Sequence, residues 1–128
     1  MVTDMGSTFQ GCSSLTSLAV SNFDTSKVTN FTGSNHDWDG IFASCTSLTS
    51  LDLSKWNTSN AVYMANMFYN CKLLKNIDLT NFDTSKVTDF SRMFWGCSNF
   101  TTLNLSSFDT AKAWNMGWMF RNCTKLKT

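Results

Sequence analysis

The stretch NIDLTNFDTSKVTDFSRMFWGCSNFT, residues 76–101, is one copy of a unit that recurs along the whole chain. Its cysteine returns at intervals of 33, 26, 26 and 26 residues, with Phe three residues before it and Leu or Phe three residues after it. The five cysteines are Cys12, Cys45, Cys71, Cys97 and Cys123. A fixed period of this length is the signature of a solenoid, in which each repeat buries its apolar face only against its neighbours.

The first part of the unit has the pattern of a short, half-buried strand. Ile77 and Leu79 flank Asp78, and this alternation places the two apolar side chains on one face. Together with Leu74 and Phe82 they match the leucine-rich spacing L-x-x-L-x-L, which occurs in four complete copies and a truncated fifth. We expect parallel strands centred on Ala19, Asp52, Asp78 and Asn104.

The second part of the unit has the period of a short helix. Val87, Phe90, Met93 and Cys97 lie three or four residues apart, which puts them on one helix face. Residues 83–85 (Asp-Thr-Ser) precede this run and can accept hydrogen bonds from its free N–H groups, as helix N-caps do. The predicted fold is therefore an α/β solenoid: a right-handed leucine-rich-repeat coil with a parallel sheet on one side and short helices on the other.

The repeats predict a single domain over residues 1–128. The first interval, 33 residues, is 26 plus 7, so one coil carries a seven-residue insertion near residues 32–38. Insertions between repeats map to loops, and loops often carry function. Neither end has a polar capping repeat, so we expect uncapped ends that expose apolar surface.

Composition excludes several functional classes. The net charge is +1 and no basic run occurs, which argues against nucleic-acid binding. The chain has no apolar run long enough to cross a bilayer and no visible signal or anchor, so no membrane insertion by this segment is expected. At 42% hydrophobic and 15% charged residues it is also not a disordered chain.

No group of residues indicates catalysis, a cofactor or a metal site. Cysteines 26 residues apart lack the closely spaced ligand pairs of metal sites, and we expect them to be reduced and buried. The single histidine, His36, lies in the insertion, and the chain has no G-x-S-x-G nucleophile motif. We therefore predict a protein that is not an enzyme.

The candidate binding surface comes from positions that the repeat leaves variable. Residues nine, five and two places before each cysteine share one face of the predicted helix, and this face is distinct from the apolar one. In the later repeats they change to Trp, Tyr and Arg, the residue types enriched in binding hot spots. The candidate partner-binding residues are Tyr69, Arg92, Trp95, Trp114, Trp118 and Arg121. The simpler alternative is that these rings only cover seams between coils.

A second candidate surface is the outward face of the predicted sheet. Asp52, Asp78 and Asn104 occupy equivalent outward positions between the strand leucines. Such a polar row could bind a glycan or a cation. Alternatively, it keeps the sheet soluble and discourages the addition of further strands.

The repeat resembles a known family. The motif MF-x-x-C-x-x-F-x-x-L-x-L-x-x-FDT at residues 93–110, with NFDTSKVTN at 22–30 and NFDTSKVT at 81–88, is similar to the bacterial surface-protein 26-residue repeat of the BspA-like leucine-rich-repeat family. The chain departs from that pattern in the insertion and at Thr8 and Ile41, where Met is expected. The resemblance implies a leucine-rich solenoid that is displayed on the cell surface or secreted and serves in adhesion or partner binding.

These observations predict a non-catalytic interaction or adhesion module of a bacterial surface protein. Its partner would be a protein or a glycan bound through the faces of the solenoid. The alternative function is a structural building block of a larger assembly, in which open repeat ends or exposed aromatic rings contact other chains. Self-association through the uncapped ends would belong to this second function.

Overall fold

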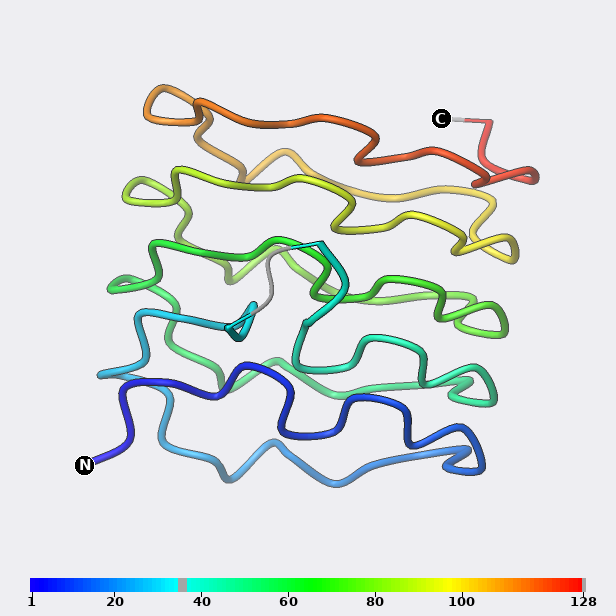
Figure 1. Ribbon diagram of the computed structural model, residues 1–128, viewed down its shortest axis with the longest axis horizontal. Helices are drawn as coiled ribbons and strands as arrows, with labels where there is room; N and C mark the ends of the chain where they lie inside the picture. The colour runs from blue at the N-terminus through cyan, green and yellow to red at the C-terminus, as the bar shows by residue number, and fades with distance from the viewer. Residues whose placement is uncertain (35–36, 128) are drawn as a thin grey trace.

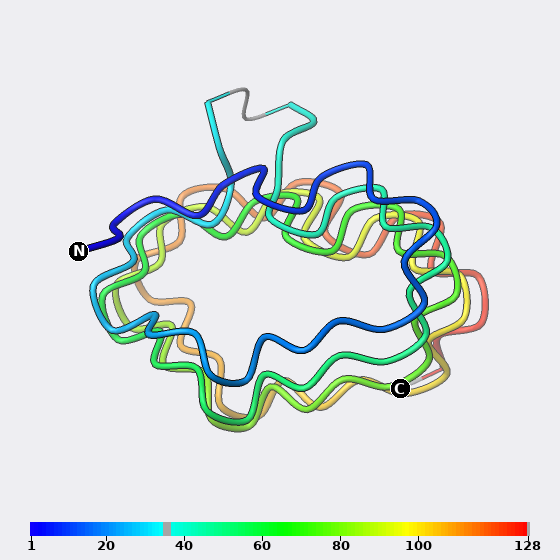
Figure 2. The same cartoon turned by 90° about the horizontal axis from the view of Figure 1, so that it is seen from below.

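The chain is wound into a stack of coils, with one repeat in each coil. The computed structural model describes residues 1–34 and 37–127, and the two termini lie at opposite ends of the stack (Figure 1). Seen along the stack, each coil is a flattened ring with two long walls (Figure 2). We call them the bridge wall, which contains Asp4, Asn30, Tyr63, Asp89 and Asn115, and the leucine wall, which contains Ala19, Asp52, Asp78 and Asn104.

The predicted α/β solenoid with a parallel sheet and short helices is wrong. The described residues form no helix and no extended strand; they form turns and isolated bridges. All four bridges are parallel and join successive coils: Asp4 to Asn30, Asn30 to Tyr63, Tyr63 to Asp89, and Asp89 to Asn115. The architecture is a stack of turn-built coils, without the layered sheet and helices of a leucine-rich repeat.

The helix does not form because residues of every unit, two of them in all units except that of Cys45, adopt left-handed backbone conformations. In the Cys97 unit these are Arg92, with φ of 54°, and Gly96, with φ of 75°. A right-handed helix cannot continue through such residues, so the chain makes separate turns. Met93 N donates to Phe90 O at 3.2 Å and Cys97 N donates to Phe94 O at 3.1 Å. The spacing of three and four residues is thus the period of consecutive turns, each closed between residues i and i+3.

On the leucine wall, a side chain bends three of the four predicted strands at their centres, all but the one centred on Ala19. Asp52 Oδ1 accepts a hydrogen bond from the backbone N–H of Ser54 at 3.0 Å, and Asp78 Oδ1 accepts one from Thr80 N–H at 2.9 Å. Asn104 makes the same contact. These Asx turns compete with extended pairing. The parallel bridges lie instead on the opposite wall, where the helices were expected to begin.

Stacked phenylalanine rings form the centre of the core. The Phe three residues before each cysteine lies against its counterpart in the next coil, with ring centroids 5.6–5.8 Å apart and planes within 11° of parallel. The column runs through Phe9, Phe42, Phe68, Phe94 and Phe120. Aromatic pairs in contact add stability beyond the area that they bury.

The cysteines tie each coil to the one before it through their thiols. Cys71 Sγ donates to Phe42 O at 3.2 Å and Cys97 Sγ donates to Phe68 O at 3.1 Å, and Cys45 and Cys123 make the equivalent contacts. All five cysteines are free, and the three central ones are buried. A thiol suits this position because it packs as a small apolar group and still donates weakly.

The Asp-Thr-Ser motif caps turns and not the helices for which it was predicted. Asp83 Oδ1 accepts from Ser85 N–H at 3.0 Å. The buried Thr84 hydroxyl donates to Asp109 O at 3.0 Å and accepts from Asp109 N–H at 2.7 Å. The equivalent threonines of two earlier coils make the same double contact. Each buried hydroxyl is therefore satisfied by the backbone of the next coil.

The insertion leaves the bridge wall between Thr32 and Asp39, and its described parts project from that wall (Figure 2). His36 lies outside the described residues. Within the described part of the chain, no helix is long and apolar enough to cross a membrane.

We predict that removing one ring from the column destabilises the whole stack. Phe68 is fully buried between Phe42 and Phe94, so Phe68→Ala should lower the free energy of unfolding by about 3–5 kcal/mol. Urea denaturation measures the loss. If Phe68→Ala does not fold, Phe68→Leu, which keeps more of the buried volume, should fold and show a smaller loss. Phe23→Ala, at a side chain that is 39% exposed, is the control. Equal losses of stability in Phe68→Ala and Phe23→Ala would contradict a special contribution of the stacked rings.

We also predict that the cysteines of the native chain react with thiol reagents in order of burial. Burial raises the pKa of the Cys71 and Cys97 thiols well above the ordinary value, and the thiolate is the reactive form. Cys12 and Cys123 are only partly buried and should be labelled first. Mass spectrometry of peptides from briefly labelled protein gives the order. Labelling of Cys71 before unfolding would show that the coils open around it.

Candidate functional site

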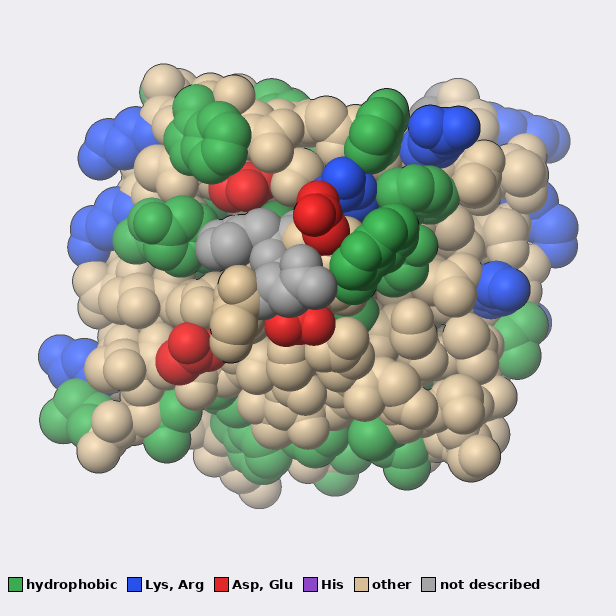
Figure 3. Space-filling model, in the orientation of Figure 1, with side chains coloured by type: hydrophobic (Ala, Val, Ile, Leu, Met, Phe, Trp, Pro, Cys, Tyr) green, Lys and Arg blue, Asp and Glu red, His purple; other side chains and the backbone are tan. Residues whose placement is uncertain are grey.

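Most of the predicted binding residues gather on the bridge wall, next to the insertion. Figure 3 shows this face, on which hydrophobic side chains surround adjacent basic and acidic groups. The contacts define an aromatic–arginine cluster: Trp38, Tyr69, Arg92, Trp95, Trp118 and Arg121. Five of its members were predicted from the sequence, whereas Trp38 was named only as part of the insertion.

Arg92 is the centre of the cluster. Its guanidinium carbon lies 4.8 Å from the ring centroid of Trp118, 5.8 Å from that of Trp38 and 5.9 Å from that of Trp95. One guanidinium nitrogen also lies 3.2 Å from Asp37 Oδ1. The Arg92 side chain is only 16% exposed, so this ion pair and the ring faces provide most of the surroundings of its charge.

The rings contact one another edge to face from coil to coil. Tyr69 and Trp95 have centroids 5.2 Å apart, and Trp95 and Trp118 have centroids 5.7 Å apart. Trp38 from the insertion meets Tyr69 at 5.8 Å. Tyr69 and Trp95 are half-buried, so they help to cover the seams between coils. The covering role and the binding role are therefore combined in the same side chains.

Two tryptophans of the cluster remain open to solvent. Trp38 is 50% exposed and Trp118 is 53% exposed. Arg121 is exposed as well, with its guanidinium carbon 5.5 Å from the Trp95 centroid and 5.6 Å from the Trp118 centroid. The cluster thus presents aromatic surface and one accessible cation, and its neighbours hold both in place.

Trp114, the sixth predicted residue, lies beside the cluster. It is 72% exposed and borders a shallow depression together with Arg92 and Asp37. The structure therefore brings Trp114 to the same face without placing it among the stacked rings.

The link between the insertion and the later coils was missed at the sequence level. Asp37 and Arg92 are 55 residues apart, and no sequence motif links the two positions. The available signal was that the only Trp-containing insertion lies two repeats before the Arg92 coil. Because the coils stack, residues of neighbouring repeats can face an insertion from an earlier one.

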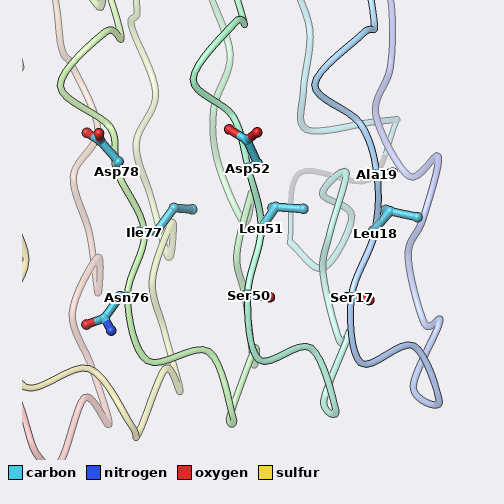
Figure 4. Close-up of a pocket in the computed structure, with 9 residues that line it drawn as sticks. All are labelled: Ser17, Leu18, Ala19, Ser50, Leu51, Asp52, Asn76, Ile77 and Asp78. Atoms are coloured by element: carbon cyan, nitrogen blue, oxygen red, sulfur yellow. The ribbon is translucent and has the colours of Figure 1, made fainter.

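The alternative polar face lies on the leucine wall and consists of side chains that already have local partners. Asp52, Asp78 and Asn104 hold Asx turns. Hydrogen bonds from the side chain and backbone of Ser54 keep the pKa of Asp52 below its usual value, and those from Thr80 do the same for the pKa of Asp78. Figure 4 shows Asp52 and Asp78 in a row beside Leu51 and Ile77, which line an open depression. This arrangement stabilises turns and does not by itself form a ligand site.

Within residues 1–34 and 37–127, no group of three or more His, Cys, Asp or Glu side chains could hold a metal ion. The chemistry available at the cluster is therefore stacking, cation–π contact and hydrogen bonding.

Comparison with known proteins gives one family. Two overlapping segments, residues 1–74 and 36–128, match the family described as Mycoplasma protein of unknown function, DUF285. No curated protein and no solved structure matches the chain. The assignment to the BspA-like leucine-rich repeats is therefore wrong, because a different family matches and the described residues lack the strands of such repeats.

We predict that Arg92→Gly loosens the cluster. Gly accepts the left-handed backbone at this position without strain, so the change removes the whole side chain, guanidinium included, without adding backbone strain. The near-ultraviolet circular dichroism of the tryptophans should weaken, and the free energy of unfolding should fall by about 1–2 kcal/mol. Arg121→Ala, at an exposed cation without the Asp37 ion pair, should have the smaller effect. Unchanged spectra in Arg92→Gly would mean that Arg92 does not order the rings.

Proposed function

The chain belongs to the DUF285 family of Mycoplasma proteins of unknown function, and we propose that it is a non-catalytic interaction module. It binds a protein or glycan partner through the aromatic–arginine cluster on the bridge wall. Three features support this function: the backbone at the cluster, its rigidity and its exposure.

The observation that carries the proposal is the backbone of Trp118. This residue has φ of 58°, and the equivalent residue of an earlier coil is Asn66, with φ of 56°. Asn tolerates the left-handed region, whereas a bulky side chain there is a genuine outlier. Because Trp118 is 53% exposed, its side chain adds little buried apolar area to offset the backbone strain. The fold imposes this backbone on the equivalent residues of other coils as well, so it is the bulky, exposed side chain at this position that favours a functional role.

The cluster is also organised before any partner arrives. Arg92 holds Trp38 and Trp118 from two distant segments, and Asp37 fixes the guanidinium. Side chains that are ordered in advance lose little conformational entropy on binding. Rigid aromatic rings with a neighbouring arginine are the composition of binding hot spots, which favours recognition over a purely structural role.

Two further predictions about function concern the location of the protein and its assembly. Location at the cell surface or in the secreted fraction followed from the BspA-like resemblance and stays a prediction. The building-block alternative also stays a prediction, and the mass of the protein in solution tests it. The absence of catalysis is part of the proposal, which assigns no reaction to the cluster.

We predict that Trp118→Asn separates binding from folding. The substitution copies Asn66 at the equivalent position, so relief of backbone strain offsets lost ring contacts, and the free energy of unfolding should change by less than about 1 kcal/mol. Binding to partners found on a glycan array or in a pull-down with the intact chain should weaken by on the order of 2 kcal/mol.

Asp52→Asn on the leucine wall is the matched control, because it keeps its turn and changes only a distant charge. Retained binding in Trp118→Asn with a large loss of stability would show that the rings serve packing. Binding that disappears in Asp52→Asn would move the site to the leucine wall.

A further inference from the structure

The depression beside the cluster is lined by aromatic and polar side chains together. It has a volume of about 370 Å³ and is bordered by Tyr63, Arg92 and Trp114. This volume falls within the range of small-molecule sites, roughly 300–1,000 Å³. Polar side chains supply the rest of the lining: Asp37, Asp89, Ser91 and Asn115.

Its aromatic rings come from coils on either side of its floor. Tyr63, Asp89 and Asn115 are successive members of the parallel bridge ladder, so the Asp89 coil lies between the coils of Tyr63 and Trp114. Two spacings of paired strands separate the outer coils by roughly 10 Å. The exposed parts of Tyr63 and Trp114 therefore flank a polar floor about as wide as one sugar ring.

The polar groups of the floor are held in place by the backbone. Asp89 is buried and its Oδ1 accepts from Ser91 N–H at 2.8 Å. Asn115 Oδ1 accepts from Gly117 N–H at 3.0 Å, which fixes the orientation of the side-chain amide. A fixed carboxylate, a hydroxyl and an amide provide acceptors and donors that match vicinal hydroxyl groups.

From this lining we propose that the depression binds a neutral saccharide, with a sugar ring held against Trp114 and Tyr63. The inference rests on the proposed binding function and identifies the ligand class at this face. Exposed aromatic rings can bury the C–H face of a pyranose, while the Asp89 and Asn115 side chains bind its hydroxyl groups.

The charges favour a neutral sugar over an acidic one. The lining contains two aspartates and one arginine, and the arginine is ion-paired with Asp37. An acidic sugar would bring its carboxylate next to Asp89 without an available cation in the lining, and like charges at close range disfavour binding.

An extended peptide is a poorer fit, because the backbone groups under the depression are already paired. Met64 N donates to Asp89 O at 3.1 Å, Phe90 N donates to Asn115 O at 2.9 Å, and Trp114 N donates to Thr88 O at 2.9 Å. Peptides that add a strand need unpaired backbone at an edge.

The test is a titration of the intact, ¹⁵N-labelled chain with methyl glucoside, N-acetylglucosamine and short β-linked oligomers of both, with N-acetylneuraminic acid as the acidic comparison. We expect saturable shifts of the Trp114 indole N–H and of the Asp89 and Asn115 amides at concentrations on the order of 1–10 mM. The acidic sugar should bind more weakly than the neutral sugars.

Trp114→Ala should lower the affinity for the neutral sugars at least tenfold and leave the thermal unfolding midpoint nearly unchanged, since the ring is 72% exposed. Asp52→Asn on the leucine wall, away from the lining, is the control and should retain the saccharide affinity.

The proposal is overturned by an absence of shifts, by equal binding in Trp114→Ala, by shifts confined to the leucine wall or by preference for the acidic sugar. If a partner is lost in Trp118→Asn while no sugar binds the depression, the saccharide inference fails and the interaction function stands.

Discussion

Every coil rests on its neighbour through one pair of stacked phenylalanine rings and one thiol. The ring of Phe68 lies between those of Phe42 and Phe94, and the Cys97 thiol donates to the carbonyl of Phe68. The pair recurs at the same place in each coil, so a single contact geometry is propagated along the stack. The chain needs this, because its described residues have neither helices nor a sheet to hold their backbone. Coil-to-coil hydrogen bonds and the column perform that function together.

Regular stacking also creates the candidate site. The repeat does not require the positions two and five residues before each cysteine to be apolar, and in the Cys97 and Cys123 coils they are half-buried or exposed. Stacking places Tyr69, Trp95 and Trp118 in ring contact across three coils. The insertion then covers part of this row, with Trp38 and Asp37 on Arg92. A surface assembled from separate coils in this way is large and rigid. Such a surface suits recognition, because it can bind a partner without the closure of a loop.

The same wall combines two kinds of surface. The cluster has rings in edge-to-face contact around a half-buried arginine, whereas the adjoining depression has rings at its rim and fixed polar groups on its floor. In the proposed functions, the first arrangement would supply contact area and the second directional hydrogen bonds. On the leucine wall, the aspartates hold turns of their own coil and no aromatic ring lines the depression beside them.

The sequence by itself determined the repeat, the residues that meet in the interior and most of the exposed candidates, since the 26-residue spacing of Phe and Cys and the variable Trp, Tyr and Arg positions are visible in one dimension. It misled on the secondary structure. A spacing of three and four residues is shared by helices and by consecutive turns, and only the left-handed backbone at Arg92 and Gly96 distinguishes them. The tertiary structure alone decided that bridges form at Tyr63 and Asp89 and not at the leucines. On the leucine wall, Asx turns bend the backbone and prevent it from pairing as strands. It alone also paired Asp37 with Arg92, a contact across 55 residues that depends on how the coils stack and that no local pattern encodes.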